Sequence, residues 1–223
     1  MNGWAEVDEL HDYHELFFLL GSQFSASLRK LSLKPTAISY DHPVRLLDST
    51  YPSLDPHQLE WLDLDIWGRI QITSVNLRTM ALSWPKIIAL RITADHDTAV
   101  APSIYTLADL AHHCPHLQKL CLPGVEVITP PPPELKSSPV SGHALKVFTM
   151  AGPENESPPF RIEVADPAQV AEFLDTLFPQ VRLEFYVEGD WERVIEKQEA
   201  LQAARRNARA RAEKDDRRLL VDG

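Results

Sequence analysis

The sequence predicts an α/β solenoid in which short parallel strands form a sheet on the concave face and irregular helices lie outside. Three observations predict it. A short apolar pattern recurs at a nearly constant distance, helical spacings and a proline precede several copies, and a charged segment without Pro or Gly follows the last copy. With 223 residues, 44% of them apolar, the chain is long enough for one sizeable core.

The repeated pattern has apolar residues at its first, fourth and sixth positions, and successive copies begin 31, 28, 30 and 28 residues apart. The copies are Leu28, Leu31 and Leu33; Leu59, Leu62 and Leu64; Ile87, Leu90 and Ile92; Leu117, Leu120 and Leu122; and Leu145, Phe148 and Met150. A unit of this size cannot bury its apolar face alone, so neighbouring copies must stack. We therefore expect parallel strands in register, with one buried row made of Leu31, Leu62, Leu90, Leu120 and Phe148.

Helical segments and prolines precede the later copies. The apolar residues with helical spacing are Leu77 and Met80 before the third copy, and Leu107, Leu110 and Ala111 before the fourth. Both copies also follow a proline, in Trp84-Pro85 and Cys114-Pro115. Because the residue before a proline disfavours helical geometry, each unit is expected to be a helix or irregular segment, a proline turn and a short strand.

A sixth, degenerate copy repeats this order of elements between residues 165 and 187. Asp166 is the expected N-cap of its helix, with Pro167 in the first turn and Gln169 as a capping-box partner. The expected apolar face of that helix is Val170, Phe173, Leu174 and Leu177. Pro179 should end the helix, and Val181, Leu183 and Phe185 alternate as in a strand.

The residues after Asp190 predict a long charged helix, because residues 191–220 contain no Pro or Gly and are rich in Ala, Glu, Arg and Lys. Its expected packing face is Val194, Ile195, Gln198, Leu201 and Ala204. Beyond Arg205 the segment is almost entirely polar, so we expect it to project or fray. The chain is thus divided into a repeat domain, 1–190, and a charged helix and tail, 191–223.

Charge restricts the class of partner. The chain has 22 basic and 32 acidic residues, a formal charge of −10, yet residues 191–220 hold nine basic and six acidic residues. The acidic excess therefore lies in residues 1–190, which disfavours nucleic acid or an anionic membrane as a partner of the repeat domain.

The longest strongly apolar run is the five residues Leu16 to Leu20, and the N-terminus lacks the features of a secretory signal. A cytoplasmic or nuclear location is expected, with Cys114 and Cys121 reduced.

No motif predicts catalysis, a cofactor or a metal. The glycines form neither of the common phosphate-binding loops, GxGxxG and GxxxxGK[ST]. His112, His113, Cys114 and His116 resemble a metal cluster, but no second ligand pair completes it, and the repeat places Cys114 in a core position. We expect Cys114 to point into the core and Cys121 to the concave side, without a disulfide or zinc. The acidic and histidine pairs near His11 and His96 have no companion nucleophile.

The concave face is the expected partner-binding surface, because side chains between the inward leucines point to the opposite side of each strand. The candidate contacts are Lys30, Trp61, Asp63, Asp65, Arg91, Lys119, Arg182 and Tyr186. Trp61, Arg91 and Tyr186 belong to residue types that anchor interfaces. The same positions suit a mixed solvated face without a partner equally well.

A family resemblance follows from these residues. The series Leu107, Leu110, Cys114, Pro115, Leu117, Leu120 and Leu122 is similar to the cysteine-bearing leucine-rich repeats that follow F-box domains. With the segments SLRKLSL, AHHCPHLQKLCL and FLDTLFP, the chain resembles fungal F-box/leucine-rich-repeat proteins over roughly residues 16 to 190. The resemblance implies a role in recognising substrates for ubiquitin ligation.

Three departures limit this resemblance. No F-box motif is found before the first copy, so binding of the Skp adaptor is not expected. The Asn that often follows the strand is missing, and TPPPPELKSSP, 129–139, occupies the place of a helix. The sequence therefore predicts a protein–protein interaction module without catalysis. The alternative is a binder of nucleic acid or an acidic partner through the basic run from Arg205 to Arg218.

Overall fold

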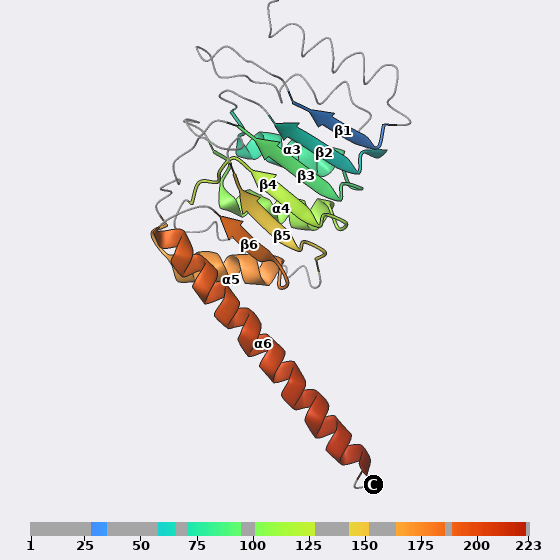
Figure 1. The fold of residues 1–223 in the computed structure, drawn as a ribbon, viewed down its shortest axis with the longest axis vertical. Helices are drawn as coiled ribbons and strands as arrows, with labels where there is room; N and C mark the ends of the chain where they lie inside the picture. The colour runs from blue at the N-terminus through green and yellow to red at the C-terminus, as the bar shows by residue number, and fades with distance from the viewer. Residues whose placement is uncertain are drawn as a thin grey trace, which may run out of the picture.

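The computed structural model describes residues 28–34, 58–65, 71–94, 101–127, 143–151, 164–185 and 189–221, with side chains up to residue 214. It has an α/β fold built on one six-stranded parallel sheet in which the strands follow each other in chain order (Figure 1). The strands are β1 (Lys30–Leu33), β2 (Trp61–Asp65), β3 (Ala89–Thr93), β4 (Lys119–Leu122), β5 (Val147–Met150) and β6 (Arg182–Phe185).

Helices lie behind this sheet and at its β6 end. They are α3 (Ser74–Ser83), α4 (Leu107–His113), α5 (Pro167–Leu177), α6 (Asp190–Val221) and the short 3-10 helix η2 (Ile104–Thr106). Figure 1 shows α3 and α4 side by side behind β2 to β5, with α5 next to β6. Among the described residues no helix lies on the opposite face, which is called the open face below.

The expected buried row is confirmed. Leu31 pairs with Leu62, Leu62 with Leu90, Leu90 with Leu120 and Leu120 with Phe148 in parallel register. Leu183 of β6 extends the row beyond the five expected members. None of these six side chains is more than 7% exposed. The constant spacing inside each apolar pattern therefore sets the register of the whole sheet.

The same backbone turn ends three of the helices. At the ends of α3, α4 and α5, the cap residues Trp84, Cys114 and Phe178 have φ between −131° and −118° and ψ between 63° and 71°. Each precedes a proline, and its carbonyl accepts the N–H of the residue three positions later, at 3.0 Å. This geometry is compatible with a following proline, so Trp-Pro, Cys-Pro and Phe-Pro end their helices in the same way.

Side chains cap the starts of two helices. Thr73 forms a capping box with Asn76 at α3, where the Asn76 N–H donates to Thr73 Oγ1 at 3.1 Å. At α5 the expected N-cap is confirmed, because Asp166 accepts the backbone N–H of Gln169 at 3.0 Å. These contacts satisfy N–H groups that have no partner within their own helix.

The fifth unit has a buried histidine shortly before its strand. The expected proline segment, 129–139, lies outside the described residues. His143 is 6% exposed, and its Nε2 donates to the carbonyl of Cys114 at 2.9 Å while its Nδ1 accepts the Leu145 N–H at 3.0 Å. This side chain joins the fourth unit to the start of the fifth.

The long helix α6 begins one residue before the expected start and packs against α5 through its first turns. Trp191 and Val194 are fully buried, and the Trp191 ring meets Phe185 with centroids 4.9 Å apart. Gln198 and Gln202 donate to the carbonyl of Val181, next to β6, at 3.4 and 2.8 Å. The first half of α6 therefore covers the end of the core.

One expected contact of α6 is wrong. Ala204 is exposed, and the next residue, Arg205, faces α5 instead. Arg205 donates to the Asp175 carboxylate and to the carbonyl of Pro179. From Arg206 to Lys214 every side chain is exposed, and Figure 1 shows this half of α6 extending away from the sheet, as expected. Within the described part of the chain, no helix has the length and apolarity to cross a membrane.

Candidate functional site

The open face of the sheet carries most of the predicted partner contacts. Lys30, Lys119 and Arg182 are exposed, and Trp61 is 38% exposed. Asp63 and Arg91 are half-buried, whereas Asp65 is only 6% exposed. Tyr186 lies outside the described residues. The alternation along each strand thus brings the described candidates to one surface, with differing access to solvent.

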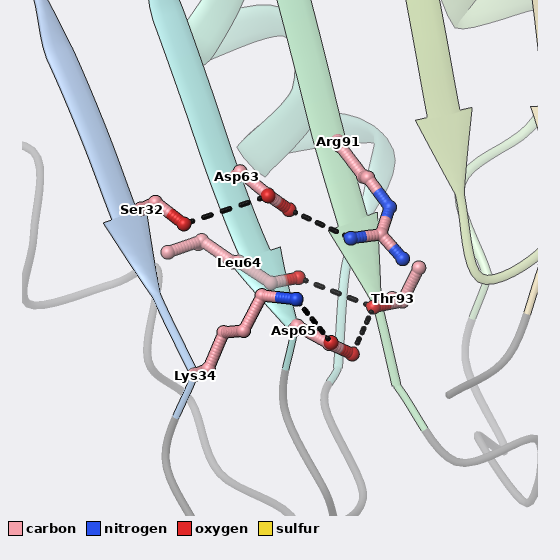
Figure 2. A network of polar contacts seen from close by, with 7 residues as sticks. All are labelled: Ser32, Lys34, Asp63, Leu64, Asp65, Arg91 and Thr93. Atoms are coloured by element: carbon pink, nitrogen blue, oxygen red, sulfur yellow. Dashed lines mark hydrogen bonds and ion pairs between the residues drawn. The ribbon is translucent and has the colours of Figure 1, made fainter. Parts of the chain in front are cut away.

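Asp63 is the centre of the first polar cluster on this face (Figure 2). Arg91 Nη1 donates to Asp63 Oδ1 at 3.1 Å from β3, and Ser32 Oγ donates to Asp63 Oδ2 at 3.5 Å from β1. Burial acts to lower the pKa of Arg91, but the adjacent Asp63 carboxylate outweighs burial, and the pKa lies above its ordinary value. Asp63, through Arg91 and Ser32, therefore links three neighbouring strands.

Asp65 forms a second cluster two residues along β2 (Figure 2). Thr93 Oγ1 donates to Asp65 Oδ1 at 2.8 Å, and Lys34 Nζ lies 3.5 Å from Asp65 Oδ2. The Thr93 side chain is fully buried. Buried polar groups need such partners, because an unpaired one loses its hydrogen bonds to water without replacement. Both carboxylates of β2, Asp63 and Asp65, thus contact side chains on or directly beside the neighbouring strands.

The two cysteines point in opposite directions, as expected. Cys114 is buried on the core side, where its Sγ lies 3.4 Å from the carbonyl of Ala81. Cys121 lies on the open face near Arg91. Burial raises the pKa of Cys114 to about 12 and that of Cys121 to about 11. Both thiols are therefore protonated at neutral pH, which makes them weak nucleophiles and weak metal ligands.

The histidine and cysteine cluster of the fourth unit is not brought together into a site. Cys114 points into the core, while His112 and His116 are exposed, and the His112 ring meets that of His113 with centroids 4.7 Å apart. Across the described ranges, no group of three or more His, Cys, Asp or Glu side chains is arranged to hold a metal ion.

Two lysines near the amino ends of the strands, Lys86 and Lys146, were not among the residues predicted from the sequence. Lys86 Nζ donates to Gln58 Oε1 at 3.0 Å, and Lys146 Nζ donates to Gln118 Oε1 at 3.1 Å. In each pair a lysine contacts a glutamine of the preceding unit. The signal was present in the spacing, since both pairs are separated by 28 residues, the distance between the two copies to which each pair belongs.

A groove lies between β6 and α6, and Arg182 of the open face forms part of its wall. Its volume is about 650 Å³, and its walls include Leu183, Ile195 and Gln202. A smaller hollow of about 240 Å³ lies beside Pro179 and is lined by Arg205, Arg206 and Arg209. The charged residues of α6 thus border both hollows, at some distance along the sheet from the Asp63 and Asp65 clusters.

Comparison of the chain with protein-family models and with curated proteins found no match. The resemblance to F-box/leucine-rich-repeat proteins therefore remains a prediction from the residues that carry it.

Proposed function

We propose that this chain is a non-catalytic protein-binding module, a leucine-rich-repeat-like solenoid that holds its partner on the open, concave face of the sheet. The observation that carries the proposal is the in-register stacking of six strands. It places alternate side chains of every strand on one surface at fixed spacings. A surface that is ordered before binding loses little conformational entropy when a partner binds.

Trp61 is the proposed anchor of this surface. It is a large apolar side chain, 38% exposed, on the face opposite the core. Its neighbours in the register are Lys30 on β1 and Ala89 on β3. A tryptophan beside a small residue offers a flat apolar area, and Trp is enriched among the residues that dominate binding energy.

The proposed role includes recognition of a target protein, as in the receptors that the sequence resembles. The resemblance favours one such role, the recognition of substrates for ubiquitin ligation. Binding of the Skp adaptor is not part of the proposal.

A photo-crosslinking experiment tests the proposed face. A benzoylphenylalanine is placed at position 61 or, as the matched control, at position 82, because Leu82 is another large apolar side chain, 53% exposed, on α3 at the helical side. We expect discrete crosslinked products from position 61 and none from position 82. Products from position 82 alone would overturn the choice of face.

A substitution measures the contribution of the anchor. Trp61→Ala should weaken binding of the crosslinked partner by more than about 1 kcal/mol, as the loss of an interface anchor does. Since Trp61 lies outside the core, the melting temperature should change little, as for Leu82→Ala. A large fall in melting temperature would mean that Trp61 supports the fold instead.

The second candidate is a binding function of α6, favoured by the exposure of all side chains from Arg206 to Lys214. A chain ending at Arg205 keeps the part of α6 that contacts α5 and loses the exposed part. Retention of the partner by this shorter chain supports the open face. Loss of the partner, with a steep dependence on salt in the full chain, would favour α6.

A further inference from the structure

We infer that the edge of the sheet at which the strands begin binds an acidic polypeptide segment. The inference rests on the proposed protein-binding function and names the chemistry of its partner. The surface consists of Lys30, Lys86, Lys119 and Lys146 together with Trp61, and it is called the basic rim below.

The members of the basic rim lie at the starts of neighbouring strands or up to three residues before them. Lys30 and Lys119 are the first residues of β1 and β4, and Trp61 is the first residue of β2. Lys146 immediately precedes β5, and Lys86 lies shortly before β3. Because neighbouring strands are about 4.8 Å apart, the rim from β1 to β5 is about 19 Å long. About six residues of extended polypeptide span that length.

The charges of the rim are not neutralised by the acidic residues near it. The described acidic side chains on the strands, or directly before one, are each paired: Glu60 with Arg29, Asp63 with Arg91, Asp65 with Lys34 and Glu184 with Arg182. All four rim lysines are exposed, and none of them forms an ion pair with a described residue. A positive surface is therefore present on a chain whose formal charge is −10.

Two rim lysines are positioned without being neutralised. The partners of Lys86 and Lys146 are amide oxygens, of Gln58 and Gln118, at 3.0 and 3.1 Å. A carboxylate at these positions would cancel the charge, whereas a neutral amide only orients the ammonium group. The ammonium group remains available to a carboxylate, and part of the entropy of ordering the lysine side chain is already lost before binding.

The positive charge and the short length of the basic rim favour an acidic peptide over nucleic acid. Carboxylates complement the four ammonium groups, and Trp61 adds an apolar area for one side chain of the same segment. A long polyanion would also meet the acidic excess of the repeat domain. Trp61 is the only aromatic side chain among the rim residues, whereas single-stranded nucleic acid is held by stacking on several.

Fluorescence anisotropy with the full chain tests the inference. The probe is a labelled ten-residue peptide of Glu with Leu and Phe at two positions, and the matched probe has Gln in place of every Glu. We expect the Glu peptide to bind about tenfold or more tightly than the Gln peptide at about 0.1 M salt. This preference should disappear at about 1 M salt, where the Debye length is about 3 Å.

Charge-matched variants locate the site. Lys86→Gln, Lys119→Gln and Lys146→Gln, combined in one chain, should reduce the affinity for the Glu peptide about tenfold. The control chain combines Lys197→Gln, Arg209→Gln and Lys214→Gln on α6, removes the same charge from exposed positions, and should change the affinity less than about twofold. An equal loss in the control chain would overturn the inference.

A third probe and the crosslinking experiment separate the remaining outcomes. A labelled single-stranded oligonucleotide that binds more tightly than the Glu peptide, and loses affinity in the rim variant, would assign the rim to nucleic acid and overturn the inference. Equal binding of the Glu and Gln peptides would overturn it as well. In either case, protein crosslinks from position 61 would still support the proposed function, and their absence would count against both.

Discussion

At the scale of single residues, His143 shows how one side chain joins two neighbouring units. The units of β3, β4 and β6 carry a cap residue before a proline, whereas in the fifth unit the His143 imidazole makes two hydrogen bonds with backbone groups. Nδ1 accepts an N–H, so it carries no proton, and the proton lies on Nε2. Burial lowers the pKa of His143, although its hydrogen bond to the Cys114 carbonyl acts in the opposite direction.

This arrangement predicts that stability falls in acid. The pKa of His143 is lower in the folded chain than in the unfolded chain, where it is about 6.5, so the unfolded state binds more protons below that pH. The contribution is fully present above about pH 6.5 and is lost at up to about 1.4 kcal/mol per pH unit as the pH falls. Urea unfolding between pH 7 and 5 measures it.

His143→Gln is the matched control for that measurement, because an amide offers one donor and one acceptor and does not titrate. We expect a smaller loss of stability with pH in this variant than in the original chain. Equal slopes would show that other groups cause the acid sensitivity.

Leu120→Ala probes the buried row at its middle. Leu120 is 1% exposed, and its truncation leaves a cavity among residues of neighbouring strands, so we expect a loss of about 2 to 5 kcal/mol in the free energy of unfolding. The exposed Leu82→Ala should cost no more than about 0.5 kcal/mol. Denaturant unfolding of both variants checks the prediction, and similar losses would contradict it.

At the scale of elements, the sequence predicted what depends on apolar spacing and missed what depends on long polar side chains. The strands and the apolar faces of α3, α4 and α5 follow from periodic leucines. Ala204 was expected on the packing face of α6, but it is exposed, and the longer Arg205 side chain reaches Asp175 and the Pro179 carbonyl instead. The burial of Thr93 and Asp65 could not be predicted from the sequence either, because burying these polar side chains is favourable only when they are paired with each other.

Arg205→Ala should therefore destabilise the junction of α5 and α6. It leaves the Asp175 carboxylate, which is 7% exposed, without its cationic partner, at a cost of about 1 to 3 kcal/mol. Arg206→Ala, at an exposed neighbouring position, should change the free energy of unfolding by less than about 0.5 kcal/mol. Thermal melts at neutral pH compare the two, and an equal effect would contradict a specific role of Arg205.

At the scale of the whole molecule, the two faces of the sheet differ in how well the sequence predicted them. The core face follows from the spacing of the apolar residues, because apolar side chains at regular positions are buried on the same side of the sheet. The contacts on the open face could not be predicted without knowing which polar side chains meet. They join residues of neighbouring units that lie 28 positions apart in the sequence. The lysine and glutamine pairs gave no charge signal, since glutamine is neutral, and so the basic rim became visible only when the units were placed side by side.

The glutamines of α6 have a consequence for self-association. A sheet of parallel strands in chain order ends in strand edges that could accept another strand, and an open edge invites molecules to join end to end. At the β6 end, Gln198 and Gln202 donate hydrogen bonds to the Val181 carbonyl, and α6 lies beside the strand. We therefore expect the helix to hinder end-to-end pairing of sheets in addition to covering the end of the core. A chain ending at Gly189 should form larger particles as its concentration rises, measured by light scattering, while a chain ending at Arg205 should remain unchanged in size.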